Sequence, residues 1–219
     1  MLTRDCADTH RSDLTYSATW KQKPRYAVIS TPYCDGTIQH VLAQKSRFPA
    51  GTFRRTHGLD DDLNDILEAL QALTVLADGS WRMEDHERNL MRGIYIVEHV
   101  LLGLLDESSA SRAAVVLAFG LYLYLGLREV PRTATVLGRM VKRLRSSFEQ
   151  DEHSADALEP GLLFWVSSLG VIAANGADDA MFFRRIVDRM SKELNIQNAD
   201  DRKEVLMDVV WTRRTSDWN

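Results

Sequence analysis

The sequence predicts an all-α protein, a single domain of about seven helices with two nearly fully buried helices at its centre. From Leu59 onward, apolar residues recur at steps of three and four, which is the period of an amphipathic helix. Two stretches, 113–127 and 160–177, contain no charged residue at all. The one short strand-like stretch, 26–29, has no second strand to pair with, and an isolated strand is not stable.

The chain divides into an irregular, basic N-terminal segment, 1–46, and a helical domain, 47–219. Residues 1–56 hold nine Lys and Arg against four Asp and Glu, a net charge of +5, so the rest of the chain carries −9 of the total of −4. The basic segment is expected to be a polar leader, and the short run "KQKPR" at 21–25 is a weak candidate for nuclear import. Cys6 and Cys34 are too few for a disulfide framework or a four-cysteine zinc site. They indicate free thiols in a reducing compartment.

The first helix is expected to begin near Leu59 and to end at Gly79. Asp60, Asp61 and Asp62 lie at its start, where the helix dipole favours negative charge. Glycine is the usual residue just beyond a helix end. The residues predicted to form its buried face are Leu63, Ile66, Leu67, Leu70 and Leu73.

The next three helices are expected over about 84–105, over 110–128 and from Pro131 onward. Ser108 and Ser109 are suitable N-caps for the third helix. Val130 and Pro131 then interrupt the pattern, and Pro131 is suited to the first position of the fourth helix. The residues predicted to face inward are Leu90, Ile94, Val97, Leu101 and Leu105 in the second helix, and Val136, Met140, Val141, Leu144 and Phe148 in the fourth.

The fifth helix is expected to start at Pro160 and to end at Asn175-Gly176. About 15 helical residues span roughly 22 Å, which is short of the roughly 30 Å of a bilayer core. The equally short run 113–127 lies between Arg112 and Arg128. Both runs therefore predict buried core helices, and no membrane segment is expected.

Two more helices are expected, one from Asp178 or Asp179 to about Asn195 and one over about 200–212. The residues predicted to face inward are Phe182, Phe183, Ile186, Val187, Met190 and Leu194 in the sixth helix, and Val205, Leu206, Val209, Val210 and Trp211 in the seventh.

No catalytic, cofactor-binding or metal-binding residue is predicted. His86 stands among three carboxylates in "EDHE", but adjacent helical residues point about 100° apart and no second His follows at i+4. Glu98 and His99 would need a third orienting group for acid–base work, and the sequence indicates none. Ser167 and Ser168 are expected to bond back to the preceding helical turn.

The remaining motifs are also read as structure. The glycines have no preceding strand and no following Lys, so they form no phosphate loop. The basic run "RMVKRLR" at 139–145 alternates with apolar residues, which is typical of an amphipathic surface helix rather than of a nucleic-acid site.

Five motifs in order resemble a known family. They are "RFPAGTF…GLDDDLNDILEALQALT", "RGIYIVEHVLLGLL", "VVLAFGLYLYLGLREVPRTATVLGRMVKRL", "EPGLLFWVSSLGVIAA" and "VLMDVVW". This succession, over about 47–214, resembles the C-terminal helical region of fungal zinc-cluster (Zn2Cys6) transcription factors. The resemblance implies a regulatory domain that acts through protein partners or senses a small molecule. It transfers no catalytic residues.

The sequence departs from that family in lacking the six cysteines of the zinc cluster, so sequence-specific DNA binding is not expected. The expected function is a regulatory or protein-interaction domain, non-enzymatic and without cofactor, located in the nucleus or cytoplasm. Protein partners are expected, and a second copy of the same chain, in a homo-oligomer, is one of the partners considered. The start "MLTRDCADTHRSDLTY" has no secretory signal, and a zinc-cluster segment encoded upstream of Met1 stays open.

The alternative function is a receptor-like domain that binds a small apolar ligand in a cavity between helices. Tight packing of helices through small residues explains the same residues and is preferred. The residues considered for the cavity are Trp165, Tyr122, Tyr124, Phe164, Gly120, Gly126 and Gly170.

Overall fold

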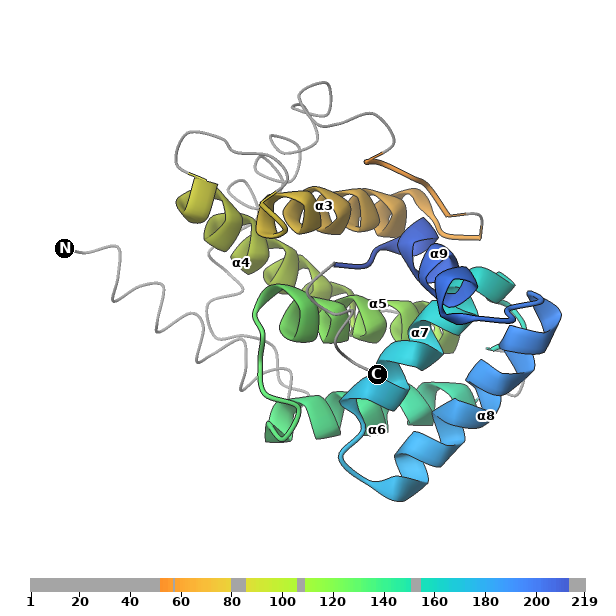
Figure 1. Ribbon diagram of the computed structural model, residues 1–219. Helices are drawn as coiled ribbons and strands as arrows, with labels where there is room; N and C mark the ends of the chain where they lie inside the picture. The colour runs from red at the N-terminus through yellow and green to blue at the C-terminus, as the bar shows by residue number, and fades with distance from the viewer. Residues whose placement is uncertain (1–51, 57, 80–85, 106–108, 151–154, 213–219) are drawn as a thin grey trace.

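The computed structural model describes residues 52–56, 58–79, 86–105, 109–150 and 155–212. Over these ranges the chain forms seven α-helices and one π-helical segment, and no strand occurs in them, so the predicted all-α class is confirmed (Figure 1). The elements are α3 (Asp61–Ala77), α4 (His86–Leu104), α5 (Ala110–Tyr122), η2 (Leu123–Leu127), α6 (Thr135–Gln150), α7 (Pro160–Ala173), α8 (Ala177–Glu193) and α9 (Ala199–Val209). The leader 1–46, its boundary and both cysteines lie outside the described residues.

Helix α3 begins and ends as its sequence predicts. The Asp60 side chain accepts a hydrogen bond from the Leu63 N–H at 2.9 Å, which satisfies one of the donors that a helix start leaves unpaired. At the other end Gly79 has φ +67°, the left-handed conformation that glycine adopts at no steric cost. All five residues of its predicted apolar face are buried.

Two helices form the centre of the molecule, as predicted. Every residue from Ala114 to Leu127, along α5 and η2, is buried, and so is every residue from Leu162 to Ser167 of α7. Helices α3, α4 and α6 pack around α5, while α8 and α9 pack against α7 (Figure 1). The Trp165 ring of α7 lies against Phe119 and Tyr122 of α5, with centroids 5.9 Å apart in both pairs.

One helical stretch in the described part of the chain, Ala110–Leu127, is long and apolar enough to cross a membrane. Of this stretch, 78% is buried inside the protein. The central helix of a helical bundle has the same length, composition and burial, so the stretch is weak evidence for a membrane span. The second charge-free run forms α7, which has only 14 residues.

Two predicted boundaries are wrong. Helix α6 begins at Thr135 and not at Pro131, because residues 131–134 form a turn in which the Ala134 N–H bonds to the Pro131 carbonyl at 2.8 Å. The chain needs this turn after Glu129, whose positive φ of 51° directs it away from the axis of α5.

The last helix stops at Val209 instead of continuing to 212. Its final carbonyls are taken by buried side chains from other helices, which replace the hydrogen bonds of a further helical turn. Gln71 donates to the Val209 carbonyl and Trp165 Nε1 to the Val210 carbonyl, both at 2.7 Å. Thr212 donates to Asp78 at 2.6 Å.

Small residues bring helices close together at two contacts. A Cβ on Gly170 of α7 would lie 2.5 Å from the Phe183 ring of α8, and a Cβ on Gly93 of α4 would lie 2.5 Å from a methyl of Leu73 in α3. Neither space would hold even an alanine without displacement. The preferred interpretation of Gly170, tight packing, is therefore confirmed.

Candidate functional site

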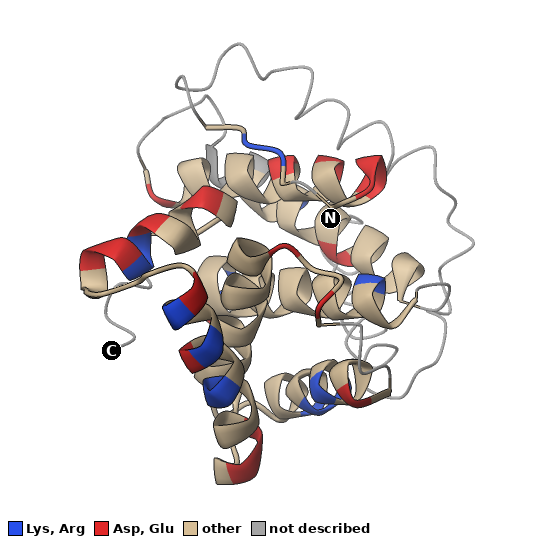
Figure 2. Cartoon of the chain, turned by 90° about the vertical axis from the view of Figure 1, so that its right-hand side faces the viewer, with Lys and Arg blue, Asp and Glu red and all other residues tan. Residues whose placement is uncertain are grey.

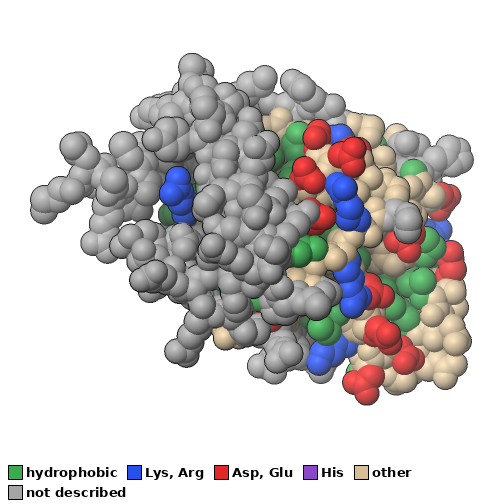
Figure 3. Space-filling view, turned by 90° about the horizontal axis from the view of Figure 1, so that it is seen from above, with side chains coloured by type: hydrophobic (Ala, Val, Ile, Leu, Met, Phe, Trp, Pro, Cys, Tyr) green, Lys and Arg blue, Asp and Glu red, His purple; other side chains and the backbone are tan. Residues whose placement is uncertain are grey.

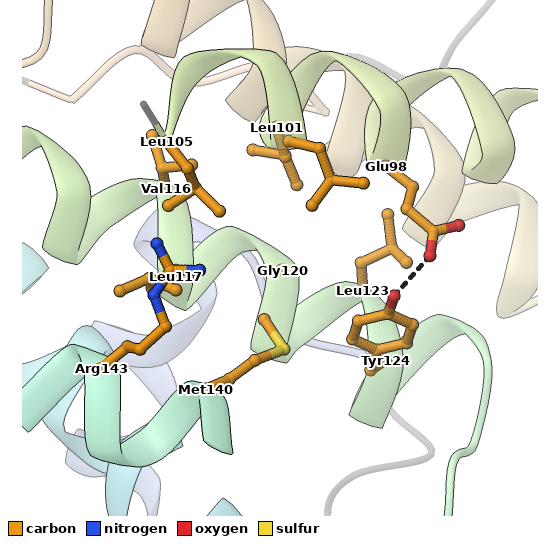
Figure 4. A pocket seen from close by; sticks show the side chains of 11 residues that line it. Glu98, Leu101, Leu105, Val116, Leu117, Gly120, Leu123, Tyr124, Met140 and Arg143 are labelled. Carbon is orange, nitrogen blue, oxygen red and sulfur yellow. Dashed lines mark hydrogen bonds between the residues drawn. The ribbon is translucent and has the colours of Figure 1, made fainter. Parts of the chain in front are cut away.

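A small cavity lies between α4, α5, η2 and α6 (Figure 4). Its free volume is about 30 Å³. About two or three water molecules fit such a space, since each needs about 10–15 Å³. The residues that line it, mostly aliphatic, are Glu98, Leu101, Leu102, Leu105, Val116, Leu117, Gly120, Leu123, Tyr124, Met140 and Arg143. Typical pockets for small-molecule ligands are about 300–1,000 Å³, so this cavity is far smaller than a ligand pocket.

The inner end of the cavity is a buried cluster around Glu98. The Glu98 and Arg128 side chains are only 4% and 5% exposed, and Glu98 Oε2 lies 2.7 Å from Arg128 Nη2. The Tyr124 hydroxyl donates a hydrogen bond to Glu98 Oε1, as Figure 4 shows. Arg128 Nη1 lies 3.4 Å from the same oxygen. A buried charge is tolerated when it is paired in this way, and the two charges cancel each other locally.

The guanidinium of Arg128 also lies over two aromatic rings. It is 5.0 Å from the ring centroid of Tyr95 and 5.6 Å from that of Tyr124, within the range of cation–π attraction. Arg128 Nη2 and Glu98 Oε2 are close enough for an ion pair, but they lack the alignment of a hydrogen bond. Arg128 Nε has no hydrogen-bond acceptor among the described residues. Arg128 is therefore held chiefly by charge and by stacking.

The cluster lies on a π-helical segment. The Arg128 N–H bonds to the Leu123 carbonyl five residues before it, at 3.0 Å, and the Val130 N–H bonds to the Tyr124 carbonyl at 2.9 Å. π-Helical turns are rare and occur frequently at functional sites. Here the π segment carries Tyr124 and ends at Arg128, and both reach the carboxylate of Glu98 on α4.

The opposite end of the cavity is formed by α6. Met140 extends its methyl group towards α5, where a Cβ on Gly120 would be 2.7 Å from it. Figure 4 shows Arg143, a half-exposed residue, at the end of the cavity away from Glu98. The cavity thus has an acceptor-rich buried end, aliphatic walls and a basic outer end.

Only two of the seven residues that the sequence suggested for a cavity line this one. Gly120 and Tyr124 line the cavity, whereas Trp165, Tyr122, Phe164, Gly126 and Gly170 lie in solid packing. Tyr122 is an example of this packing, because it is buried and its hydroxyl lies 2.7 Å from the Thr74 hydroxyl of α3. Burial raises the pKa of Tyr122 far above its usual value, an effect that the bond to Thr74 reduces and Asp78 increases.

The sequence did not indicate a third group at Glu98, and the structure supplies two, Tyr124 and Arg128. They are 26 and 30 residues away along the chain, so no local spacing could show them. The available signal was the charged pair Arg128-Glu129 directly after a long apolar run. His99 follows Glu98 as a half-buried residue.

The serine pair, His86 and the basic run singled out in the sequence occupy structural positions. Ser168 donates to the Phe164 carbonyl at 2.8 Å as expected, but the Ser167 hydroxyl is buried without a partner in the described ranges. Among these same residues no group of three His, Cys, Asp or Glu side chains could hold a metal ion. His86 is the first residue of α4. Of the basic run, Lys142 is exposed and the three arginines are half-buried, as on an amphipathic helix.

The chain was compared with protein-family models, with curated proteins and with solved structures, and nothing matches in any of the three. The resemblance to the fungal regulatory region therefore stays a prediction.

Proposed function

We propose that the helices form a regulatory domain without a catalytic centre of its own, and that a small apolar molecule bound in the cavity controls how it meets its protein partners. The carrying observation is the position of the cavity. It lies between four helical elements, and its inner wall includes the π segment and the Glu98–Tyr124 hydrogen bond. A ligand there would contact α4, η2 and α6 at once and could change their relative placement.

The chemistry of the cavity supports binding more than catalysis. Its walls are aliphatic, and its only described ionisable side chains are Glu98, Tyr124 and Arg143. Glu98 already contacts a cation and a hydroxyl, an arrangement typical of a satisfied structural carboxylate. The regulatory role itself is supported by the resemblance to the fungal regulatory regions, as are partner proteins and a nuclear or cytoplasmic location.

A second candidate is a protein-interaction domain that needs no ligand. The outer face of α8 favours it, because Arg184, Arg185, Asp188 and Arg189 are all exposed there. Figure 2 shows basic and acidic residues interleaved along α8. Alternating charges provide specificity for a protein partner more than affinity for nucleic acid.

The face above α3 has the same mixed character. Arg55 lies 3.4 Å from Asp61 and 3.2 Å from Asp65, and Arg112 lies 3.5 Å from Asp62. Figure 3, which looks onto the molecule from above, shows acidic and basic side chains next to one another on this face. A basic patch of one sign, which nucleic acid would require, is therefore not formed by these residues.

A reporter assay tests the proposal. The full chain is fused to an unrelated DNA-binding module and the output of a reporter gene is measured. We expect the fusion to change the output relative to the module alone. We also expect Gly120→Ala to alter this effect, because the new methyl group would lie 2.7 Å from the Met140 methyl, which must shift, and both residues line the cavity.

Gly103→Ala is the matched control, since nothing lies within 4 Å of a Cβ at that exposed position of α4. An output unaffected by the fusion would contradict the regulatory role. An effect that both alanine variants retain in full would leave the ligand-free interaction domain as the better account.

A further inference from the structure

We propose that Asn175 is a site of spontaneous covalent modification, deamidation, at which the side-chain amide is lost and aspartate or isoaspartate replaces asparagine. Asn175 lies in the short connection 174–176 between α7 and α8, which Figure 1 shows in light blue at the lower edge of the molecule. It is the only asparagine of the whole sequence that is followed by glycine. The modification is independent of the cavity and of any ligand.

The reaction needs only two adjacent residues and water. The backbone nitrogen of Gly176 attacks the side-chain carbonyl carbon Cγ of Asn175, and the new bond closes a five-membered cyclic imide. The bond from Cγ to Nδ2 breaks, and Nδ2 leaves as ammonia with the proton of the Gly176 N–H. Water then opens the imide at Gly176: cleavage at Cγ gives aspartate, and cleavage at the main-chain carbonyl gives isoaspartate. Because the attack is intramolecular, it gains rate from proximity.

The structure leaves both reacting groups open. Gly176 has no Cβ, so no side chain of its own shields its nitrogen. Among the residues that the structure describes, no acceptor bonds to the Gly176 N–H, whereas its carbonyl accepts from the Ala180 N–H at 3.1 Å. Asn175 is exposed, and its side chain forms no hydrogen bond with another described residue. Gly138 of α6, which lies beside the amide, has no side chain that could hold it.

A second pair shows what protection looks like. Asp78-Gly79 is the one Asp-Gly pair in the described ranges, and it could form the same imide with loss of water. Its groups are engaged, however: the Gly79 N–H donates to the Leu76 carbonyl at 3.0 Å, and the Asp78 carboxylate accepts from Thr212 at 2.6 Å. The contrast between the two pairs favours reaction at Asn175.

The products change the connection between α7 and α8 in two ways. Both carry a carboxylate in place of the amide, close to the first turn of α8, where Asp178 and Asp179 already lie. Isoaspartate also adds one carbon atom to the main chain of this short connection. Because α7 and α8 are closely packed at Gly170, a longer connection should disturb that contact.

Incubation of the native full chain at neutral pH and physiological temperature tests the assignment. Peptide mapping by mass spectrometry follows the gain of about one dalton, and an isoaspartyl methyltransferase labels isoaspartate. We expect the modification at Asn175, at a rate close to that of a synthetic peptide of residues 170–181. A rate more than about tenfold below that of the peptide would overturn the inference, because it would mean that the fold holds the reacting atoms apart.

Gly176→Ala is the matched variant. A φ of −120° suits any residue, and the only atom within 4 Å of a Cβ there is Asp179 Oδ2, at 4.0 Å. The variant should therefore fold and modify severalfold more slowly, because the new methyl group shields the nitrogen. An unchanged rate would show that this nitrogen is not the nucleophile.

The melting temperature tests the effect on the fold. Asn175→Asp carries the new charge without the longer main chain, so it separates the two changes. We expect the isoaspartate form, isolated from the incubated chain, to melt below Asn175→Asp. Equal melting temperatures would overturn the disturbed contact between α7 and α8.

Discussion

At the scale of single residues, the Glu98–Arg128 pair is the least expected feature of the molecule. The sequence predicted Glu98 on the second helix and placed Arg128 at the end of the third, but it gave no sign that they meet. Pairing across 30 residues depends on how helices pack, and neither helical period nor capping carries that information. Apolar residues were easier to place, because Ile94 and Val97 follow the period and are buried.

A double-mutant cycle measures this pair. Glu98→Gln and Arg128→Met should each lower the free energy of unfolding by about 3–5 kcal/mol, because each leaves one buried charge without its partner. The double variant should lose clearly less than the two single losses combined. Urea denaturation gives all four values.

Arg189→Met serves as the control, since Arg189 and its partner Asp156 are 53% and 65% exposed and 3.7 Å apart. An exposed pair of this kind contributes at most about 1 kcal/mol. Purely additive losses in the cycle would show that Glu98 and Arg128 do not stabilise each other.

At the scale of elements, the sequence predicted all seven helices but not the form of their ends. Apolar periodicity continues unchanged through 123–127, so nothing marks the change from α to π hydrogen bonding there. The end of α9 is set by Gln71 and Trp165, which lie far away in the chain. Ends that local residues fix, such as Asp60 at α3 and Pro160 at α7, were placed correctly.

The contact of α7 with α8 gives a prediction at this scale. Gly170→Ala should destabilise the protein by about 1–3 kcal/mol, because the new Cβ meets the buried Phe183 ring at 2.5 Å. Gly103→Ala should instead leave stability unchanged or raise it by up to about 1 kcal/mol, since alanine is the better helix former and the site is open. Thermal unfolding compares the two. Equal effects would mean that α7 and α8 are not in close contact at Gly170.

At the scale of the whole molecule, composition and periodicity were sufficient for the all-α class and for the two buried central helices. They were not sufficient for the cavity, of whose lining the sequence indicated only Gly120 and Tyr124. A cavity is the space that packed side chains leave, and it depends on details such as the orientation of Met140. The proposed regulatory role rests on the resemblance to the fungal regions, and the proposed ligand rests on this cavity.

The most direct test of the central claim is the melting temperature of the full chain in the presence of a set of small apolar compounds. We predict that at least one compound raises it with the logarithm of its concentration, by about 5–10 °C at a hundred times its Kd. The same compound should have little effect on Gly120→Ala and its full effect on Gly103→Ala. If no compound stabilises the native chain, or if the effect is equal in Gly120→Ala, the cavity is not a ligand site.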